Sequence, residues 1–324
     1  MLVRALLSPS CLRWHLLLAC MTVCHAVAIR SLDASPATEL QVHHGPSVNS
    51  SPIIWPVDLP APLSVEVSDL GSSKTTNFTA SLPACDGRLY GRNLRLSSCM
   101  QLYHAMSSYT VPQTFGERST GNYDAPLPFR YLSHDGLCAL DLAHAAGVMS
   151  DTIAPVDLKV AARLLISVCV AQAPNEGGLL TGLGQNKALA LRLVPYRPTV
   201  ICGPDNSGPP WVSCRDIVDR MPANNKKQIF GPKGDARTTV VLPWKYTTTR
   251  QRCGLFVDGT EPGRTTDTGD WYKIWAAANA VDFMCTQLGR NGSATRLGDD
   301  KRLHVELRDM KDSNAANDEL ITTS

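Results

Sequence analysis

Cysteine spacing is the feature that most constrains how this chain folds. The 324 residues include eleven cysteines, of which Cys11, Cys20 and Cys24 lie in an N-terminal leader and eight follow it. The eight form two sets of four, with successive gaps of 14, 39 and 31 residues in the first set and 12, 39 and 32 in the second. An even number of cysteines in an oxidising compartment predicts disulfides. The predicted disulfide cysteines are Cys85, Cys99, Cys138 and Cys169, then Cys202, Cys214, Cys253 and Cys285.

The residues between the cysteines also repeat. Ser98–Cys138 aligns without a gap to Ser213–Cys253, with ten identities in 41 positions. Unrelated segments of ordinary composition share roughly two or three over that length. Gly177–Leu193 aligns to Asn291–Leu307 with seven identities in 17 positions. We therefore predict a duplication, with one module at residues 85–195 and another at 196–307.

Apolar periodicity predicts the same elements in both modules. A short amphipathic helix follows the second cysteine, and a longer helix ends at the fourth, with Asp267 or Thr268 as the N-cap in the second module. Strands alternate apolar and polar residues, as in Leu303, Val305 and Leu307. The order predicts an α+β fold of two tandem disulfide-stapled βαββαβ-like sandwich modules, each with a four-stranded antiparallel sheet and two helices.

This plan places all four cysteines of a module at one edge of its sandwich. Spacing does not choose among the three possible pairings within a set. We favour pairing the second cysteine with the third and the first with the fourth, always within one module.

The two ends of the chain have a different composition. Residues 1–28 combine two arginines, an apolar run and the ending Ala26-Val27-Ala28, which predicts a secretory signal peptide cleaved after Ala28. A signal anchor is the alternative, but the apolar run is short for a bilayer. Residues 29–84 are rich in Pro, Ser and Thr, and residues 308–324 are predicted to form a polar flexible tail. Secretion makes the sequons candidates for glycosylation, namely Asn49, Asn77 and Asn291.

Charge argues against two classes of partner. Loss of the leader removes two of the 31 basic residues and leaves 29 basic and 29 acidic side chains. A neutral chain without a basic block is poorly suited to nucleic acid or an anionic membrane. No second apolar run is long enough to span a bilayer, so we expect a secreted, extracellular protein with no membrane span.

No catalytic, cofactor or metal site is predicted. Asp267-Thr268-Gly269 spells the aspartic protease triplet, but no apolar strand precedes it and the first module has no matching triplet. The six histidines after the leader show no metal-ligand spacing. Trp271 and Trp275 lie one turn apart on an apolar stripe, which favours a core role over a sugar-binding face.

One resemblance can be given for this pattern. The run from Cys214 to Met221-Pro222, with Phe230-Gly231, Leu242-Pro243, Trp275 and Leu297-Gly298, resembles uncharacterised small secreted proteins of filamentous fungi. The sequence is more distantly similar to secreted necrosis-inducing effectors of plant-pathogenic fungi. These motifs are structural, so the resemblance implies a compact disulfide-bonded α+β fold and transfers no catalytic residue.

The sequence therefore favours a secreted, non-enzymatic protein that binds an unidentified ligand on a host or cell-wall surface, as an effector would. One alternative is an extracellular hydrolase with an unrecognised site, which predicts a cleft with paired carboxylates or a histidine–carboxylate contact. Another is a structural cell-wall glycoprotein, which predicts no pocket.

Overall fold

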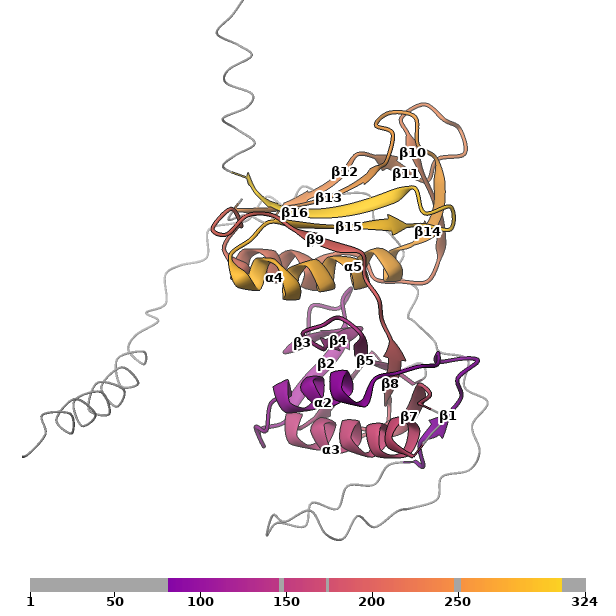
Figure 1. Ribbon diagram of the computed structural model, residues 1–324, viewed down its shortest axis with the longest axis vertical. Coiled ribbons are helices and arrows are strands. Elements are labelled where there is room, and N and C mark those ends of the chain that lie inside the picture. The colour runs from indigo at the N-terminus through magenta and orange to yellow at the C-terminus, as the bar shows by residue number, and fades with distance from the viewer. Residues whose placement is uncertain (1–80, 146–148, 173–174, 248–251, 311–324) are drawn as a thin grey trace, which may run out of the picture. The chain divides into compact units, whose positions relative to one another are not determined.

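The computed structural model describes residues 81–145, 149–172, 175–247 and 252–310, all within one compact unit, Val48–Ser324. The predicted leader, most of the Pro/Ser/Thr-rich segment, Asn49 and Asn77 lie outside the described residues. The described chain is mixed α+β, with four sheets and four α-helices (Figure 1). No helix in these four stretches is long and apolar enough to cross a membrane.

The first half of the described chain builds one five-stranded and one three-stranded sheet. The larger sheet has the order β1 (Ala84–Cys85), β7 (Gly178–Leu183), β8 (Leu189–Pro195), β5 (Cys138–His144) and β4 (Phe129–Leu132). The smaller sheet contains β3 (Ala125–Leu127), β2 (Gln113–Glu117) and β6 (Ser150–Ile153). The helices are α2 (Leu96–Ala105) and α3 (Pro155–Leu165), which continues into a π-helical turn, η2 (Ile166–Ala171). Both helices lie on one side of the larger sheet (Figure 1).

The second half builds the same set of elements. Its larger sheet has the order β12 (Trp244–Thr247), β13 (Cys253–Gly259), β16 (Leu303–Asp309), β15 (Gly292–Leu297) and β9 (Val200–Cys202). Its smaller sheet contains β11 (Val240–Leu242), β10 (Lys227–Pro232) and β14 (Asp267–Asp270). The helices are α4 (Trp211–Arg220) and α5 (Trp271–Met284), followed by the 3-10 turn η3 (Thr286–Leu288). Strand β16 extends two residues past Leu307, where the sequence predicts the second module to end.

The central strands of the two larger sheets pair in the same register. On the first sheet, Leu140 lies opposite Leu193. On the second, Leu255 lies opposite Leu307. The sequence predicts equivalent apolar positions in the two modules, all of which are buried: Leu140 and Leu142 with Leu255 and Val257, and Leu189, Leu191 and Leu193 with Leu303, Val305 and Leu307. The predicted inward face of each sheet is therefore confirmed.

The prediction of four antiparallel strands per module is wrong in number. Each larger sheet has five strands and is antiparallel throughout, whereas β2–β3 and β10–β11 are parallel pairs in the smaller sheets. The sequence predicts a short strand ending near Cys85 or Cys202, which matches β1 and β9. It does not predict β2, β4, β6 and β7 or their counterparts β10, β12, β14 and β15. Those strands have four to six residues, which show only a weak period of two.

Helix α5 begins two or three residues later than predicted. Its N-cap is Asp270, whose side chain accepts a hydrogen bond from the Lys273 N–H at 2.9 Å. Asp267 and Thr268 lie instead in strand β14, so the prediction of either as the cap is wrong. Two acidic residues precede the apolar stripe, and the stripe alone does not show which one starts the helix.

Asp267 stabilises a hairpin turn. Its carboxylate is buried and accepts hydrogen bonds from the backbone N–H groups of Asp300 at 3.0 Å and Arg302 at 2.9 Å. Asp151 does the same in the first half, accepting at 3.0 Å from the backbone N–H of Asn186. A carboxylate held by backbone donors in a structural turn does not support the protease interpretation of Asp267-Thr268-Gly269.

The repeated Leu-Gly motif follows from this turn. Gly184 and Gly298 have φ values of +88° and +83°, which disfavour any residue with a Cβ. A Cβ at either position would also collide with the carboxylate of Asp151 or Asp267. The two glycines are therefore required by both backbone conformation and close approach.

Four disulfides join the eight predicted cysteines. The bonds are Cys85–Cys169, Cys99–Cys138, Cys202–Cys285 and Cys214–Cys253. Every bond stays within its own half, and the favoured pairing of second with third and first with fourth is confirmed. Cα–Cα distances of 5.2–5.3 Å are normal for disulfides.

Each half has its own apolar core between its larger sheet and its helices. Trp271 and Trp275 of α5 are each 1% exposed, which confirms their core assignment. The sequence aligns Ala161-Ala162 with Ala277-Ala278 after one inserted residue, and Ala162 of α3 and Ala278 of α5 are both fully buried. Small side chains let both helices approach their sheets closely.

Candidate functional site

The outer face of the first large sheet, which faces away from its own helices, is covered by the second half of the chain. Strand β5 is buried at every position, whereas β13 is half-exposed at Phe256 and Asp258. Helix α5 packs against β4, and its Ala280 joins a small apolar cluster with Leu132 and Ala139. Helix α5 therefore lies between the two halves and contacts both.

Asp141 lies at the centre of this covered face. It is fully buried on β5, with Arg130 of β4 and Arg192 of β8 as its direct cross-strand neighbours. Arg130 donates from Nε to Oδ1 at 2.6 Å and from Nη2 to Oδ2 at 2.9 Å. Arg192 donates from Nη2 to Oδ2 at 2.8 Å. A single carboxylate thus holds two guanidinium groups.

Tyr272 of α5 links this trio to the second half. Its hydroxyl donates to Asp141 Oδ2 at 2.5 Å and accepts from Arg130 Nη2 at 3.0 Å. It also accepts a hydrogen bond from Arg192 Nη2. The four residues form one charge-assisted network across the contact between the halves, which we call the Asp141 network.

The Asp141 network fixes the protonation states of its members. Burial acts to raise the pKa of Asp141, but Arg130 and Arg192 outweigh it and hold this pKa well below its usual range. Burial also acts to lower the pKa of Arg130, and Asp141 reverses this. Burial followed by the Asp141 charge raises the pKa of Tyr272. At neutral pH the network therefore contains one carboxylate, two guanidinium groups and a neutral phenol.

Aromatic rings surround the Arg130 guanidinium. Its Cζ lies 4.6 Å from the ring centroid of Tyr196 and 5.5 Å from that of Trp275. Burial raises the pKa of Tyr196 to about 12, so its hydroxyl remains neutral. Cation–π contacts with a desolvated guanidinium add to the attachment between the halves.

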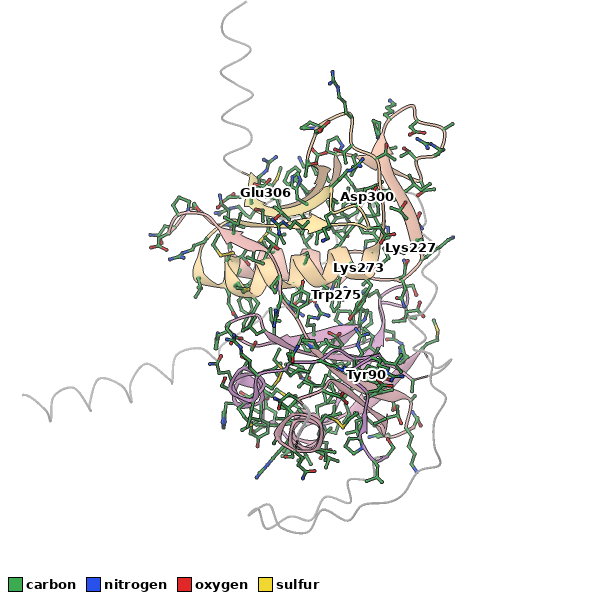
Figure 2. All side chains as sticks on the ribbon, turned by 45° about the vertical axis from the view of Figure 1, so that its right-hand side comes forward. Tyr90, Lys227, Lys273, Trp275, Asp300 and Glu306 are labelled. Atoms are coloured by element: carbon green, nitrogen blue, oxygen red, sulfur yellow. A yellow bond between two sulfur atoms is a disulfide. The ribbon has the colours of Figure 1, made fainter. Side chains whose placement is uncertain are left out.

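A cleft of about 440 Å³ opens beside the Asp141 network. It is lined by residues of β8, the connecting segment 195–199, α5 and β15, together with Tyr90 and Gly91. Lys273 projects from α5, and Tyr90 belongs to the first half of the chain (Figure 2). Among the described residues, five cations and no carboxylate line the cleft. The cations are Arg130, Arg192, Arg197, Lys273 and Arg296.

The cations of the cleft differ in how far neighbouring carboxylates neutralise their charge. Lys273 lies 3.6 Å from an Asp270 oxygen and 3.7 Å from an Asp299 oxygen, so part of its charge is neutralised. Arg197 and Arg296 are both exposed to solvent. The deep part of the cleft therefore carries one net positive charge from the Asp141 network, and its mouth carries two exposed guanidinium groups.

A second contact fixes the two halves together away from the cleft. Arg118, in the loop after β2, donates from Nη1 to the Val218 and Asp219 carbonyls near the end of α4. Its Nη2 donates to the Pro128 carbonyl at 2.9 Å. Burial lowers the pKa of Arg118 to about 10, which leaves it charged at neutral pH. A cation at a helix C-terminus is stabilised by the helix dipole and by the free carbonyl groups.

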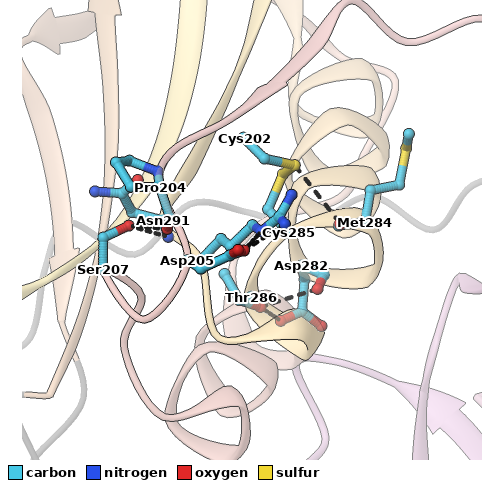
Figure 3. The surroundings of a disulfide bond; sticks show 10 residues. Cys202, Pro204, Asp205, Ser207, Asp282, Met284, Cys285, Thr286 and Asn291 are labelled. Atoms are coloured by element: carbon cyan, nitrogen blue, oxygen red, sulfur yellow. Dashed lines mark hydrogen bonds and ion pairs between the residues drawn. A yellow bond between two sulfur atoms is a disulfide. The ribbon is translucent and has the colours of Figure 1, made fainter.

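A smaller cavity of about 160 Å³ lies between α2, β4, α4 and α5. Asp282 of α5 lines it, accepting a hydrogen bond from Thr286 Oγ1 at 2.6 Å, with Arg215 Nη1 4.0 Å away. Burial raises the pKa of Asp282 to about 6. Figure 3 shows Asp282 and Thr286 beside the Cys202–Cys285 disulfide. Asp282 therefore titrates in a mildly acidic range.

The one predicted sequon within the described residues is in the same region. Asn291 is half-buried, and its backbone carbonyl accepts a hydrogen bond from the Gly203 N–H at 2.9 Å. Its backbone N–H donates to Ser207 Oγ at 3.4 Å (Figure 3). Glycosylation at Asn49, Asn77 and Asn291 stays a prediction.

Sequence reasoning missed the Asp141 network. One signal was available, because Asp141 is a single acid within the apolar strand Cys138-Ala-Leu-Asp-Leu-Ala. The aligned residue of the second half is Phe256, which gave no reason to look for a charge there. Arg130 and Arg192 are far apart in the sequence, and only the sheet register brings them to Asp141.

Comparisons with known proteins supply no assignment. Searches against protein-family models, curated proteins and solved structures each returned no match. No group of three or more His, Cys, Asp or Glu side chains within the four described stretches is arranged to hold a metal ion. The cleft is therefore the feature of the described residues that points to a function.

Proposed function

We propose that this protein is a secreted, non-enzymatic binding protein that holds an anionic ligand in the cleft beside the Asp141 network. The observation that carries the proposal is the lining of the cleft, which contains five cations and no carboxylate among the described residues. A concave site lined by one sign of charge attracts ligands of the opposite sign. Its volume falls within the ~300–1,000 Å³ range of small-ligand sites.

The proposal includes an origin by internal duplication of one disulfide-stapled module. The equal disulfide pattern, the equal register of β5 and β13, and the shared roles of Asp151 and Asp267 support it. Both halves also contain a cis Leu-Pro bond at aligned positions, Leu127-Pro128 and Leu242-Pro243. Repeats that share a framework but differ on their surfaces suit a division into a support and a ligand-binding unit.

The chemistry of the cleft favours binding over hydrolysis. Asp141 is bonded to Arg130 and Arg192, which line the cleft, and these two residues keep the pKa of Asp141 well below its usual range. A carboxylate held by two guanidinium groups is a poor general acid or base at neutral pH. The presence of a charged cleft also argues against a purely structural wall protein, for which we expect no pocket.

Secretion and a fungal origin are part of the same proposal. The predicted leader, four disulfides and the resemblance to small secreted fungal proteins support a role outside the cell. An anionic ligand on a host or cell-wall surface is consistent with an effector-like or surface-binding protein.

Calorimetric titration with polyanions tests this function. The secreted protein is titrated with polygalacturonate, dextran sulfate and polyglutamate, and with neutral dextran as a comparison. We expect at least one polyanion to bind, with an affinity that falls as salt rises. Binding of neutral dextran alone, or of no polymer, contradicts the proposal.

Matched charge variants locate the site. The double variant Arg197→Gln/Arg296→Gln removes the two exposed cations at the mouth of the cleft. The control, Lys245→Gln/Arg308→Gln, removes the same charge from the outer face of the second sheet. We expect the cleft variant to weaken binding about tenfold or more, at about 1.4 kcal/mol per factor of ten, and the control to leave it nearly unchanged. Equal weakening by both variants would place the ligand outside the cleft.

A further inference from the structure

We infer that the cleft takes a short carboxylated oligosaccharide, a chain of uronic-acid residues. This inference rests on the proposed function and specifies the chemical class of the ligand at the same site. Three properties of the cleft carry it, namely its charge density, its tyrosines and its floor.

The charge density of the cleft suits a monoanion. In the deep part, Asp141 offsets one of the two charges of Arg130 and Arg192. Lys273 is offset by Asp270 and Asp299. One net positive charge at depth matches one monoanionic carboxylate, whereas a phosphate dianion would leave negative charge unpaired there. The two exposed arginines at the mouth can pair with carboxylates of further residues along a chain.

Tyrosine side chains supply the second property. Tyr90, Tyr196 and Tyr272 line the cleft together with its cations. Tyr90 lies close enough to Arg192 for that charge to act on its ionisation, although burial dominates and raises the pKa of Tyr90. A tyrosine offers an apolar ring face and a hydroxyl on one rigid side chain. A sugar residue presents the complementary pair, an apolar C–H face and a rim of hydroxyl groups.

The third property is a floor of small residues. Ala276, Ala277 and Ala294 line the cleft with Gly298 and Gly91, and none of them has a side chain larger than a methyl group. Small side chains at these positions leave room for a sugar ring to approach the cleft wall. The volume of about 440 Å³ fits a short oligosaccharide and is too small to enclose a polymer.

The experiment compares ligands of equal length. Calorimetry measures binding of an α-1,4-linked galacturonic acid hexamer and of its methyl ester. It also measures binding of a hexasaccharide that carries sulfate groups and no carboxylates, and of inorganic phosphate. We expect the acidic hexamer to bind at least tenfold more tightly than each of the other three. Tyr90→Ala should weaken binding of the hexamer severalfold, and so should Arg296→Gln. The control Arg308→Gln should not.

The outcomes separate this inference from the proposed function. If the sulfated hexasaccharide or phosphate binds as tightly as the acidic hexamer, the uronic-acid assignment is overturned and the anion-binding function stands. If the methyl ester binds as tightly, carboxylate recognition is overturned. If none of the anions binds and the polyanion titration is also negative, the proposed function fails as well. If the hexamer binds but Arg308→Gln alone weakens it, the site is misplaced.

Discussion

Strands β5 and β13 can be compared position by position, because each pairs with its neighbours in the same register. On the outer face of the first sheet, Asp141 lies between Arg130 and Arg192. On the second sheet, Phe256 takes the place of Asp141 and lies between Lys245 and Glu306. The inner faces of both strands are buried and apolar at the equivalent places.

The difference lies in what covers each outer face. Asp141 is fully buried beneath α5, and its charge is satisfied by two guanidinium groups and the Tyr272 hydroxyl. Phe256 remains half-exposed, with the Arg308 Cζ 3.9 Å from its ring centroid. The same framework therefore supports one outer face that holds the second half of the chain and borders a cleft, and one that faces solvent. Stability resides in the shared inner faces, and the site resides in the residues that differ.

The largest difference in stability between the two outer faces is expected when the buried charge of Asp141 is removed. Asp141→Ala leaves two guanidinium groups side by side at a buried contact with no counter-ion. We expect a loss of about 3–5 kcal/mol in the free energy of unfolding. Phe256→Ala at the equivalent, half-exposed place should cost only about 1 kcal/mol. Guanidinium-induced unfolding of both variants measures the difference, and equal losses would show that the two faces are not distinct.

The helices of the two halves also differ in a group that makes stability depend on pH. Asp282 of α5 is buried with its pKa raised to about 6, whereas the place three residues before the equivalent cysteine in the first half is Ile166. A raised folded pKa means that the folded state binds the proton more tightly than the unfolded state, where the value is 3.8. Protonation of Asp282 therefore favours folding, and this contribution is lost as pH rises through about 6.

Asp282→Asn should remove this pH dependence. The amide cannot ionise, so the variant should exceed the wild-type protein by up to ~3 kcal/mol above pH 7 and match it near pH 4. Its carbonyl can still accept from Thr286, which keeps the turn intact. Urea unfolding at several pH values provides the test. If the free energies of unfolding of wild type and variant change in parallel from pH 4 to pH 7, Asp282 is not the source of the pH dependence.

Larger side chains at the two buried alanines test whether the helix–sheet contacts of the two halves are equally tight. Ala162 of α3 and Ala278 of α5 are both fully buried against their sheets. Ala162→Leu and Ala278→Leu should each destabilise the protein by about 1–3 kcal/mol. Thermal unfolding of the two variants should give similar losses. A large cost at one position and none at the other would mean that the two helix–sheet contacts are built differently.

The smallest effect is expected on the open face of the second sheet. Arg308→Ala removes a cation–π contact with Phe256 at a half-exposed position. A loss of only about 0.5–1 kcal/mol is expected for a contact of this kind. Unfolding in urea measures it, with Glu306→Gln as a neighbouring control on the same face. A loss above about 3 kcal/mol would indicate that Arg308 has a buried role comparable to that of Arg130.

Local patterns predicted the elements that repeat. Cysteine spacing correctly gave the eight bonded cysteines, although it did not choose their pairing. The alternating leucines correctly gave the inner strand faces, because these depend on short-range periodicity. Strands such as β2, β4, β6 and β7 were missed, because segments of four to six residues show only a weak period of two.

The candidate site could not be predicted in the same way. Arg130, Asp141 and Arg192 meet only through the strand register, and Tyr272 reaches them from α5 on the other half of the chain. These are long-range contacts between residues that look like solvated charges when taken one at a time. A buried acid at the centre of an apolar strand is the one local signal that could have located the site.

The most direct test of the account is amide hydrogen exchange of the intact protein with and without the galacturonic acid hexamer. The two faces are read in one experiment, because peptides from both sheets are followed together. The account predicts ligand-dependent protection in residues 190–199, 270–277 and 294–298, with no change in residues 244–247 and 253–258. Protection confined to 244–258, or spread equally over both sheets, would contradict the assignment of the ligand site to the cleft beside Asp141.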